Sequence, residues 1–303
     1  MYKKVTYIEH KLRLIAQTQA PYTNTIGLGR SILALGTLLT LLVNPIDNIF
    51  IKSITGKFIT PILDTDLKYN FFYLLGAEKI LLMKWLAIVI LAIVISGFFQ
   101  KITSILHWWI AFSFLHSSTV IDGGDQIAAI ISLLIIPICI LDNRKNHWHK
   151  KIVERKLSNI ISIVFINIIR LQVAIIYFHA AVGKFGHEEW EDGTAIYYWL
   201  NHSFFGSNDF FNFINIFLKN SFIVSGLTYG VLVLELMIFL ALFASIRYRL
   251  LILPVAIFFH IFIILFLGIF SFFFSICAAL ILYLYPTYSD IEPQKIYILL
   301  YKK

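Results

Sequence analysis

Charged residues are scarce in this chain of 303 residues. Asp, Glu, Lys and Arg make up 14% of it, whereas 59% is hydrophobic and the mean hydropathy is +0.81. A soluble globular domain carries about 25% charged residues, so the chain has too little polar surface to cover a globule in water. The composition excludes an ordinary soluble protein and indicates that lipid surrounds much of the chain.

Cysteine is almost absent too. Cys139 and Cys277 are the two present, and each lies inside an apolar stretch. This number excludes a disulfide framework, and the spacing excludes a C-x-x-C redox pair. Oxidation of a peptide thiol by a cysteine pair is therefore disfavoured as a function.

Linkers, repeats and common site motifs are missing as well. No Gly/Ser/Pro-rich run divides the chain and no internal repeat occurs, which favours one bundle. The sequence has no G-x-x-x-x-G-K-[ST], H-E-x-x-H or G-x-S-x-G motif, and its nine histidines are scattered. No metal site is predicted. His147 and His149 flank Trp148 in a basic loop, which favours a role at the membrane interface over metal binding.

Long apolar runs are what the chain does contain. Eight of them approach the 17 to 25 residues that span about 30 Å of hydrocarbon, at 26–43, 80–99, 102–120, 124–141, 158–182, 222–245, 250–268 and 270–285. The sequence therefore predicts an all-α fold, a polytopic transmembrane helical bundle of about eight spans.

The net charge of +8 does not indicate nucleic-acid binding, because the basic residues lie between apolar runs and form no continuous patch. Most of them fall on one side of the predicted membrane, which places both termini in the cytoplasm. The predicted organisation is an amphipathic cytoplasmic segment at 1–25, a transmembrane domain at 26–285 with an aromatic outer lid loop at 183–220, and a cytoplasmic tail at 286–303.

Ionisable residues inside membrane spans are costly and often functional. Arg170 and Glu235 have opposite charges at similar predicted depth, so they form either a structural ion pair or a centre for substrate or proton handling. His260 stands near the middle of the seventh span, where a satisfied core histidine and a functional one are both open.

The outer ends of the third and fifth spans carry the other candidates. Arg170, Tyr177 and Lys184 are spaced by seven and share a helix face, whereas His179 points away from Lys184. Lys184 either reaches the headgroups or acts as a general base. His116 follows an aromatic stripe and precedes a turn with two carboxylates, Asp122 and Asp125.

Two segments resemble a known family. STVIDGGDQIA at 118–128 and LDNRKNHW at 141–148 resemble the SdpB family of antimicrobial-peptide maturation membrane proteins. QVAIIYF at 172–178 with Lys184, Trp190 and Asp192-Gly193, and FFH at 258–260, are similar to the wider superfamily of vitamin K-dependent gamma-carboxylase-like (HTTM) membrane domains.

The SdpB resemblance implies a subunit of the bacterial cell membrane that works with a small SdpA-like protein to mature a secreted toxin precursor peptide. The carboxylase resemblance implies a lipid quinone or hydroquinone as cofactor. In that family a lysine matching Lys184 is the base, a histidine matching His116 assists, and one matching His260 lies near the quinone. The chain lacks the carboxylase's large soluble domain and has Gly183 where the carboxylase has a second lysine.

These expectations leave three classes of function open. The first is quinone-linked maturation of the peptide, with Lys184, His116 and His260 as catalytic residues. The cavity would then be shaped by Arg170, Tyr177, His179, Glu235, Asp122, Asp125 and Trp190. The second is a non-enzymatic scaffold for the SdpA-like partner and the precursor, and the third is immunity to the toxin.

Overall fold

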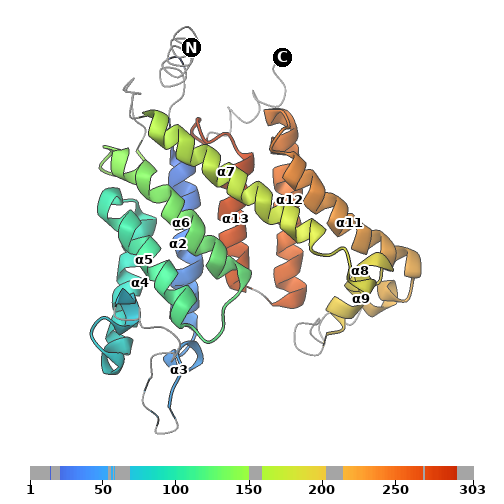
Figure 1. Cartoon of the computed structure of the whole chain (residues 1–303), viewed down its shortest axis with the longest axis horizontal. Coiled ribbons are helices and arrows are strands. Elements are labelled where there is room, and N and C mark those ends of the chain that lie inside the picture. Colours follow the sequence, from blue (N-terminus) through green and yellow to red (C-terminus); the bar gives the residue numbers. More distant parts are fainter. Residues whose placement is uncertain are drawn as a thin grey trace, which may run out of the picture.

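The chain folds into a bundle of helices (Figure 1). The computed structural model describes residues 21–53, 69–149, 159–202, 214–268 and 270–291, together with residues 14, 56 and 58. These residues form helices joined by turns, with two isolated β-bridges and no longer strand among them. The prediction of an all-α bundle is confirmed.

Eight helices correspond to the eight predicted spans. They are α2 (Asn24–Val43), α4 (Ile80–Ser96), α5 (Gln100–Ser117), α6 (Gly123–Leu141), α7 (Asn159–Val182), α11 (Ser221–Leu240), α12 (Ile246–Leu267) and α13 (Phe270–Leu284). Short helices lie between them: α3 (Ile46–Ile49), η2 (Phe71–Tyr73), η3 (Ala77–Lys79), α8 (Glu188–Glu191), α9 (Ala195–Leu200) and α10 (Ile214–Leu218).

Six of the described helical segments are long and apolar enough to cross a membrane: α2, η3 with α4, α6, α7, α11 and α12. Helix α5 is not among them, and it carries polar residues such as Gln100 and His107. Helix α13 is apolar but has 15 residues, a length of about 22 Å at 1.5 Å per residue. The protein is a membrane protein, and full crossings by α5 and α13 stay predictions.

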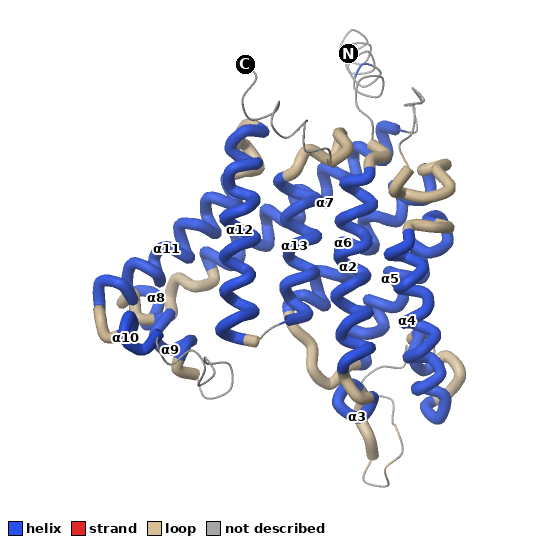
Figure 2. The backbone as a smooth tube through the Cα atoms, turned by 180° about the vertical axis from the view of Figure 1, so that it is seen from behind, coloured by secondary structure: helices blue, strands red, loops and turns tan. Residues whose placement is uncertain are grey.

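Helix α13 occupies the centre of the bundle (Figures 1 and 2) and packs against α2, α6, α7 and α12. Its buried residues belong to the larger apolar core, which also takes residues from α11. A second core joins α2 to α3, η2, α4 and α5. Helix α2 therefore connects the two halves of the bundle.

Burial differs sharply between the helices, as expected for a protein in lipid. Within the apolar window of α2, 61% of the residues are buried, against 17% in α12. Because α12 is the most hydrophobic of the candidate spans, its large exposed surface suits lipid rather than water.

Two glycines permit sharp turns between consecutive helices. Gly268, at φ +70°, ends α12 and allows α13 to begin at Phe270. Gly97, at φ +85°, ends α4, and a Cβ there would lie 2.7 Å from atoms of Asn146 and His147. The backbone of the loop at 142–149 can therefore approach α4 closely, and His147 N donates to Gly97 O at 3.1 Å.

The start of α2 and the end of α13 lie together on one face, which we call the terminal face. Thr23 Oγ1 donates to Thr287 O at 2.8 Å, and Asn24 N donates to Asp290 Oδ1 at 2.8 Å. Helix α7 starts at this face and runs diagonally across the bundle toward α8 and α9 (Figures 1 and 2).

The predicted lid loop at 183–220 is described at 183–202 and 214–220. Helix α9 packs against α11 and α12, and α10 packs against α11, so this part lies at the flank of the bundle beside α11. The remainder of the loop, most of the amphipathic segment predicted at 1–25 and the end of the tail lie outside the described residues.

Candidate functional site

Lys184 and Glu235 form a buried ion pair between α7 and α11. Helix α7 ends at Val182, and Lys184 lies in the turn that follows. Its Nζ donates to Glu235 Oε1 at 2.7 Å, to Glu235 Oε2 at 2.8 Å and to the carbonyl of Ala180 at 2.8 Å. The side chains are 21% and 8% exposed, so the ammonium group binds inside the bundle rather than extending to the headgroups.

Trp190 covers this ion pair. Lys184 Nζ lies 5.1 Å from the centroid of the indole ring, within the range of a cation–π interaction. Trp190 is buried, and it forms a small apolar cluster with Ala195 of α9 and Leu232 of α11. The ion pair and the cluster together hold the segment after α7 onto α11.

The expected pairing of Arg170 with Glu235 is wrong, because Glu235 bonds Lys184. Arg170 Nη1 instead faces Asn167 Oδ1, one turn earlier in α7, at 3.5 Å. The reason is the diagonal course of α7. It carries Arg170 to the neighbourhood of Arg249, in the first turn of α12, while Lys184 reaches Glu235 two heptads later.

Tyr177 and His260 meet in the core beside this centre. Tyr177 Oη lies 3.5 Å from His260 Nε2, and the rings meet edge-on at 6.1 Å. His260 Nδ1 lies 2.7 Å from the carbonyl of Ala256. A carbonyl accepts only, so the geometry assigns the hydrogen to Nδ1 and leaves Nε2 as the acceptor for the tyrosine hydroxyl. His260 is therefore a satisfied core histidine in this structure.

His116 is not brought to Lys184. It is exposed in the last turn of α5, with Nδ1 2.8 Å from the carbonyl of Phe112 and its ring 4.2 Å from the Phe112 ring. Helix α5 packs mainly against α4 and α6, on the other side of the bundle from α11 (Figure 1). His179 is exposed on the outside of α7 beside Phe178, which settles its orientation.

Asp122 and Asp125 cap the start of α6. Asp122 Oδ1 accepts from Gly124 N at 2.6 Å and from Asp125 N at 3.2 Å, while Asp125 Oδ2 accepts from Asp122 N at 3.0 Å. The hydroxyl of Ser271 donates to Asp122 Oδ2 and ties this cap to α13. Both carboxylates are engaged in a capping box, so their visible role is structural.

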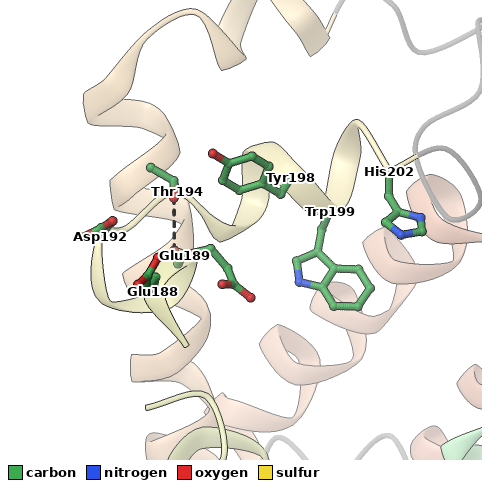
Figure 3. A pocket seen from close by; sticks show the side chains of 7 residues that line it. All are labelled: Glu188, Glu189, Asp192, Thr194, Tyr198, Trp199 and His202. Carbon is green, nitrogen blue, oxygen red and sulfur yellow. Dashed lines mark hydrogen bonds between the residues drawn. The ribbon is translucent and has the colours of Figure 1, made fainter. Parts of the chain in front are cut away.

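A pocket of about 470 Å³ opens beside α8 and α9 (Figure 3). Three carboxylates gather at one end and the Trp199 ring lies between them and His202. Its lining residues are Glu188, Glu189, Asp192, Thr194, Tyr198, Trp199 and His202. Glu188, Glu189 and Asp192 of this lining are near neighbours in the sequence of Trp190, the residue that covers the ion pair.

A second buried polar cluster, at the terminal face, was not predicted. Arg30 is 1% exposed; its Nη2 donates to Thr103 Oγ1 at 2.5 Å, and its Nη1 lies 3.3 Å from His147 Nδ1. Ser31 Oγ lies 3.2 Å from His147 Nε2. The interface role expected for His147 is wrong, because its ring is buried against Arg30 in α2.

Burial lowers the pKa of His147 to about 3, and the charges of Arg30 and Arg144 act in the same direction. Arg144 is paired with Asp142 at 2.7 Å, and its Nη1 donates to the carbonyls of His147 and His149. The position of Arg30 inside an apolar run was the one sequence signal for this cluster. Its partners come from segments more than 70 residues away, which no local pattern reveals.

Within the described ranges, no group of three or more His, Cys, Asp or Glu side chains is placed to hold a metal ion. Cys139 and Cys277 are both buried free thiols. Among the described residues, the candidate for a functional centre is therefore the compact group of Lys184, Glu235 and Trp190. Tyr177 and His260 lie next to it.

Comparison with known proteins identifies the family. The chain is 36% identical over 278 residues to the sporulation-delaying protein SdpB of Bacillus subtilis, covering 90% of this chain and 85% of that protein. This chain belongs to the SdpB family. It is also 38% identical over 288 residues to the uncharacterized protein YitO of the same organism, covering 93% of this chain and 92% of YitO. No family model matches the chain, and no solved structure matches it.

Membership of the SdpB family confirms the resemblance drawn from the two segments at 118–128 and 141–148. The structure gives both segments a physical role, since the first forms the cap of α6 and the second forms the loop that packs on Arg30. The wider similarity to carboxylase-like domains stays a prediction.

Proposed function

We propose that this protein is a component of the bacterial cell membrane required for the maturation of a secreted antibacterial peptide toxin. Its support is membership of the SdpB family over nine tenths of the chain, including a relative whose name refers to sporulation delay. The precursor peptide and a small SdpA-like protein are the proposed partners, and both termini are proposed to lie in the cytoplasm.

The Lys184–Glu235 ion pair is the observation that supports the segment after α7 as the place where the protein acts. It ties the turn after α7, and with it α8 and α9, to α11. The Lys184 ammonium group donates to both carboxylate oxygens of Glu235 and to the carbonyl of Ala180, so its three N–H groups are engaged and it has no free electron pair with which to remove a proton. This arrangement supports a scaffold that holds the outer segment for the precursor and its partner, in preference to a resting general base.

The residues present do not fit a quinone at this centre. The Lys184 ammonium is occupied by Ala180 and Glu235 and is covered by Trp190. His260 is packed against Tyr177 and Phe272, and His116 lies with α5. We therefore derive no step through a quinone.

The pocket beside α8 and α9 adds chemistry for recognition. Carboxylates at one end and aromatic faces along its wall suit a positively charged part of a peptide, through charge attraction and cation–π contact. Since α9 packs on α11, changes at the ion pair would shift the pocket as well.

The test is mass spectrometry of the peptide secreted by cells that carry the toxin genes and this protein, at matched membrane levels of each variant. Lys184→Ala removes the ion pair, whereas Lys184→Arg keeps a positive charge for Glu235 but cannot act as a base at neutral pH. A scaffold predicts little mature peptide with Lys184→Ala and near-normal peptide with Lys184→Arg.

A general base at this position predicts loss of the mature peptide in both variants, and the mass of the precursor that remains would name the missing reaction. Full peptide from Lys184→Ala would refute a role for this centre in either form. Protection of toxin-treated cells by this protein alone, with no effect on the peptide, would favour immunity instead.

A further inference from the structure

Two arginines from different helices lie near each other, and no acidic side chain among the described residues pairs with either. Arg170 lies in α7 and Arg249 in the first turn of α12, close enough for their charges to repel. The Nε atom of each is buried without a hydrogen-bond partner. Over the described part of the chain, Arg249 makes no hydrogen bond or ion pair, and Arg170 has one weak bond, to Asn167.

Among the described residues, the groups around the two arginines supply no negative charge. Tyr288 and Tyr283 are the titratable neighbours of both arginines. The Tyr288 hydroxyl accepts from Asn167 Nδ2 at 3.2 Å, and burial raises the pKa of Tyr288, so the phenol stays neutral. The Tyr283 hydroxyl donates to the carbonyls of Ile238 and Phe239. Two adjacent, half-buried positive charges without an anion are unfavourable.

The place of this pair in the fold suits a ligand from the membrane. Arg249 lies in the first turn of α12, and Tyr288, in the segment after α13, neighbours both arginines. Leu171, Tyr248 and Leu251 beside the arginines are exposed, so the site borders the lipid-facing surface. The start of α12 adds the positive end of a 22-residue helix dipole.

We propose that Arg170 and Arg249 bind the phosphate group of an anionic phospholipid between α7 and α12. Guanidinium groups are well matched to phosphate oxygens, because they donate in a planar fork. One phosphate between them replaces the repulsion by two attractive pairs. The acyl chains of the lipid would then cover the exposed apolar residues of α7 and α12.

The experiment uses the purified full-length protein in detergent, with native mass spectrometry to titrate bound lipid. The probes are dioleoylphosphatidylglycerol, dioleoylphosphatidylcholine and inorganic phosphate. The variant is the double change Arg170→Gln with Arg249→Gln. Arg247→Gln is the matched control, because it removes an exposed positive charge from the same turn of α12.

We expect one phosphatidylglycerol to bind wild type in clear preference to phosphatidylcholine. At about 1 kcal/mol per arginine, the double variant should bind it roughly 30-fold more weakly, while Arg247→Gln should change it by less than about fivefold. If inorganic phosphate but not phosphatidylglycerol stabilises the wild-type protein, and the double variant loses this effect, the two arginines bind a free phosphate ion and the lipid assignment is wrong.

Equal binding of the two lipids by wild type together with no effect of phosphate would overturn the proposal, and this comparison needs no variant. Equal losses in the double variant and in Arg247→Gln would also overturn it, because the effect would then be one of net charge. If the double variant does not fold, the single variant Arg249→Gln replaces it in the lipid titration.

Discussion

At the scale of single residues, the packing of the helices depends on how each buried charged side chain is paired. Lys184 and Glu235 satisfy each other, and Arg144 and Asp142 do the same at the terminal face. Arg30 is held by Thr103 and His147, and no carboxylate of the described residues pairs with it. Because a buried charge without a partner is costly, these residues constrain how α2, α7 and α11 pack.

The Lys184–Glu235 pair predicts strong energetic coupling. Glu235→Leu leaves the ammonium without its carboxylate and should lower the free energy of unfolding by about 3 kcal/mol, the lower end for a buried pair because Lys184 is partly exposed. The double variant Lys184→Met with Glu235→Leu should recover most of this loss. Unfolding in mixed micelles measures both, and additive single effects would contradict the coupling.

His147 predicts a loss of stability in acid. Its pKa is about 3 in the folded protein against an ordinary value of 6.5, so below pH 6.5 the unfolded chain binds a proton that the folded chain does not. The free energy of unfolding should fall as the pH falls from 6.5 toward 3, by up to about 1.4 kcal/mol per pH unit from this residue.

His147→Gln is the variant for this prediction, since the amide keeps hydrogen-bonding capacity toward Arg30 and Ser31 without titrating. Its unfolding free energy should depend on pH less steeply by about one proton over that range. An identical slope in wild type and variant would show that other groups cause the acid sensitivity.

At the scale of elements, local sequence determines where α6 starts, whereas packing against other helices determines the course of α7. The D-G-G-D turn at 122–125 forms the capping box that starts α6, with bonds between neighbouring residues only. The diagonal course of α7 is set by the helices around it. Seven-residue spacing predicts one helix face for Arg170, Tyr177 and Lys184, but α7 ends at Val182 before Lys184, and each of the three residues meets a different partner.

Removal of the α6 cap tests the structural role of Asp122. Asp122→Ala loses the bonds to Gly124 N, Asp125 N and the Ser271 hydroxyl, and should destabilise the protein by about 1–2 kcal/mol. Asp122→Asn keeps an effective cap and should cost less than half as much. A loss of mature peptide with Asp122→Asn at wild-type stability would instead indicate a functional carboxylate.

At the scale of the whole molecule, the bundle places its two polar centres apart. The Arg30–His147 cluster lies at the terminal face with α2, α5 and the loop at 142–149, and the Lys184–Glu235 centre lies between α7 and α11. With the loop cytoplasmic, as the distribution of basic residues predicts, the pocket beside α9 would open toward the outer side.

Cysteine labelling tests this orientation. The two native cysteines are buried and can be replaced by alanine, after which Lys145→Cys and Lys219→Cys each introduce one exposed thiol. A membrane-impermeant maleimide should label Lys219→Cys in intact cells and Lys145→Cys only after permeabilisation. The reverse pattern would invert the topology and place the pocket in the cytoplasm.

The sequence by itself determined the membrane environment, the all-α class, the approximate positions of the long helices and the SdpB family, because hydropathy and motifs act over short stretches. Only the tertiary structure decided that Glu235 pairs with Lys184, that His147 is buried on Arg30 and that His116 lies apart. Those outcomes depend on helix tilt and on contacts across distances of 50 to 120 residues along the chain, where no periodicity in the sequence carries the information.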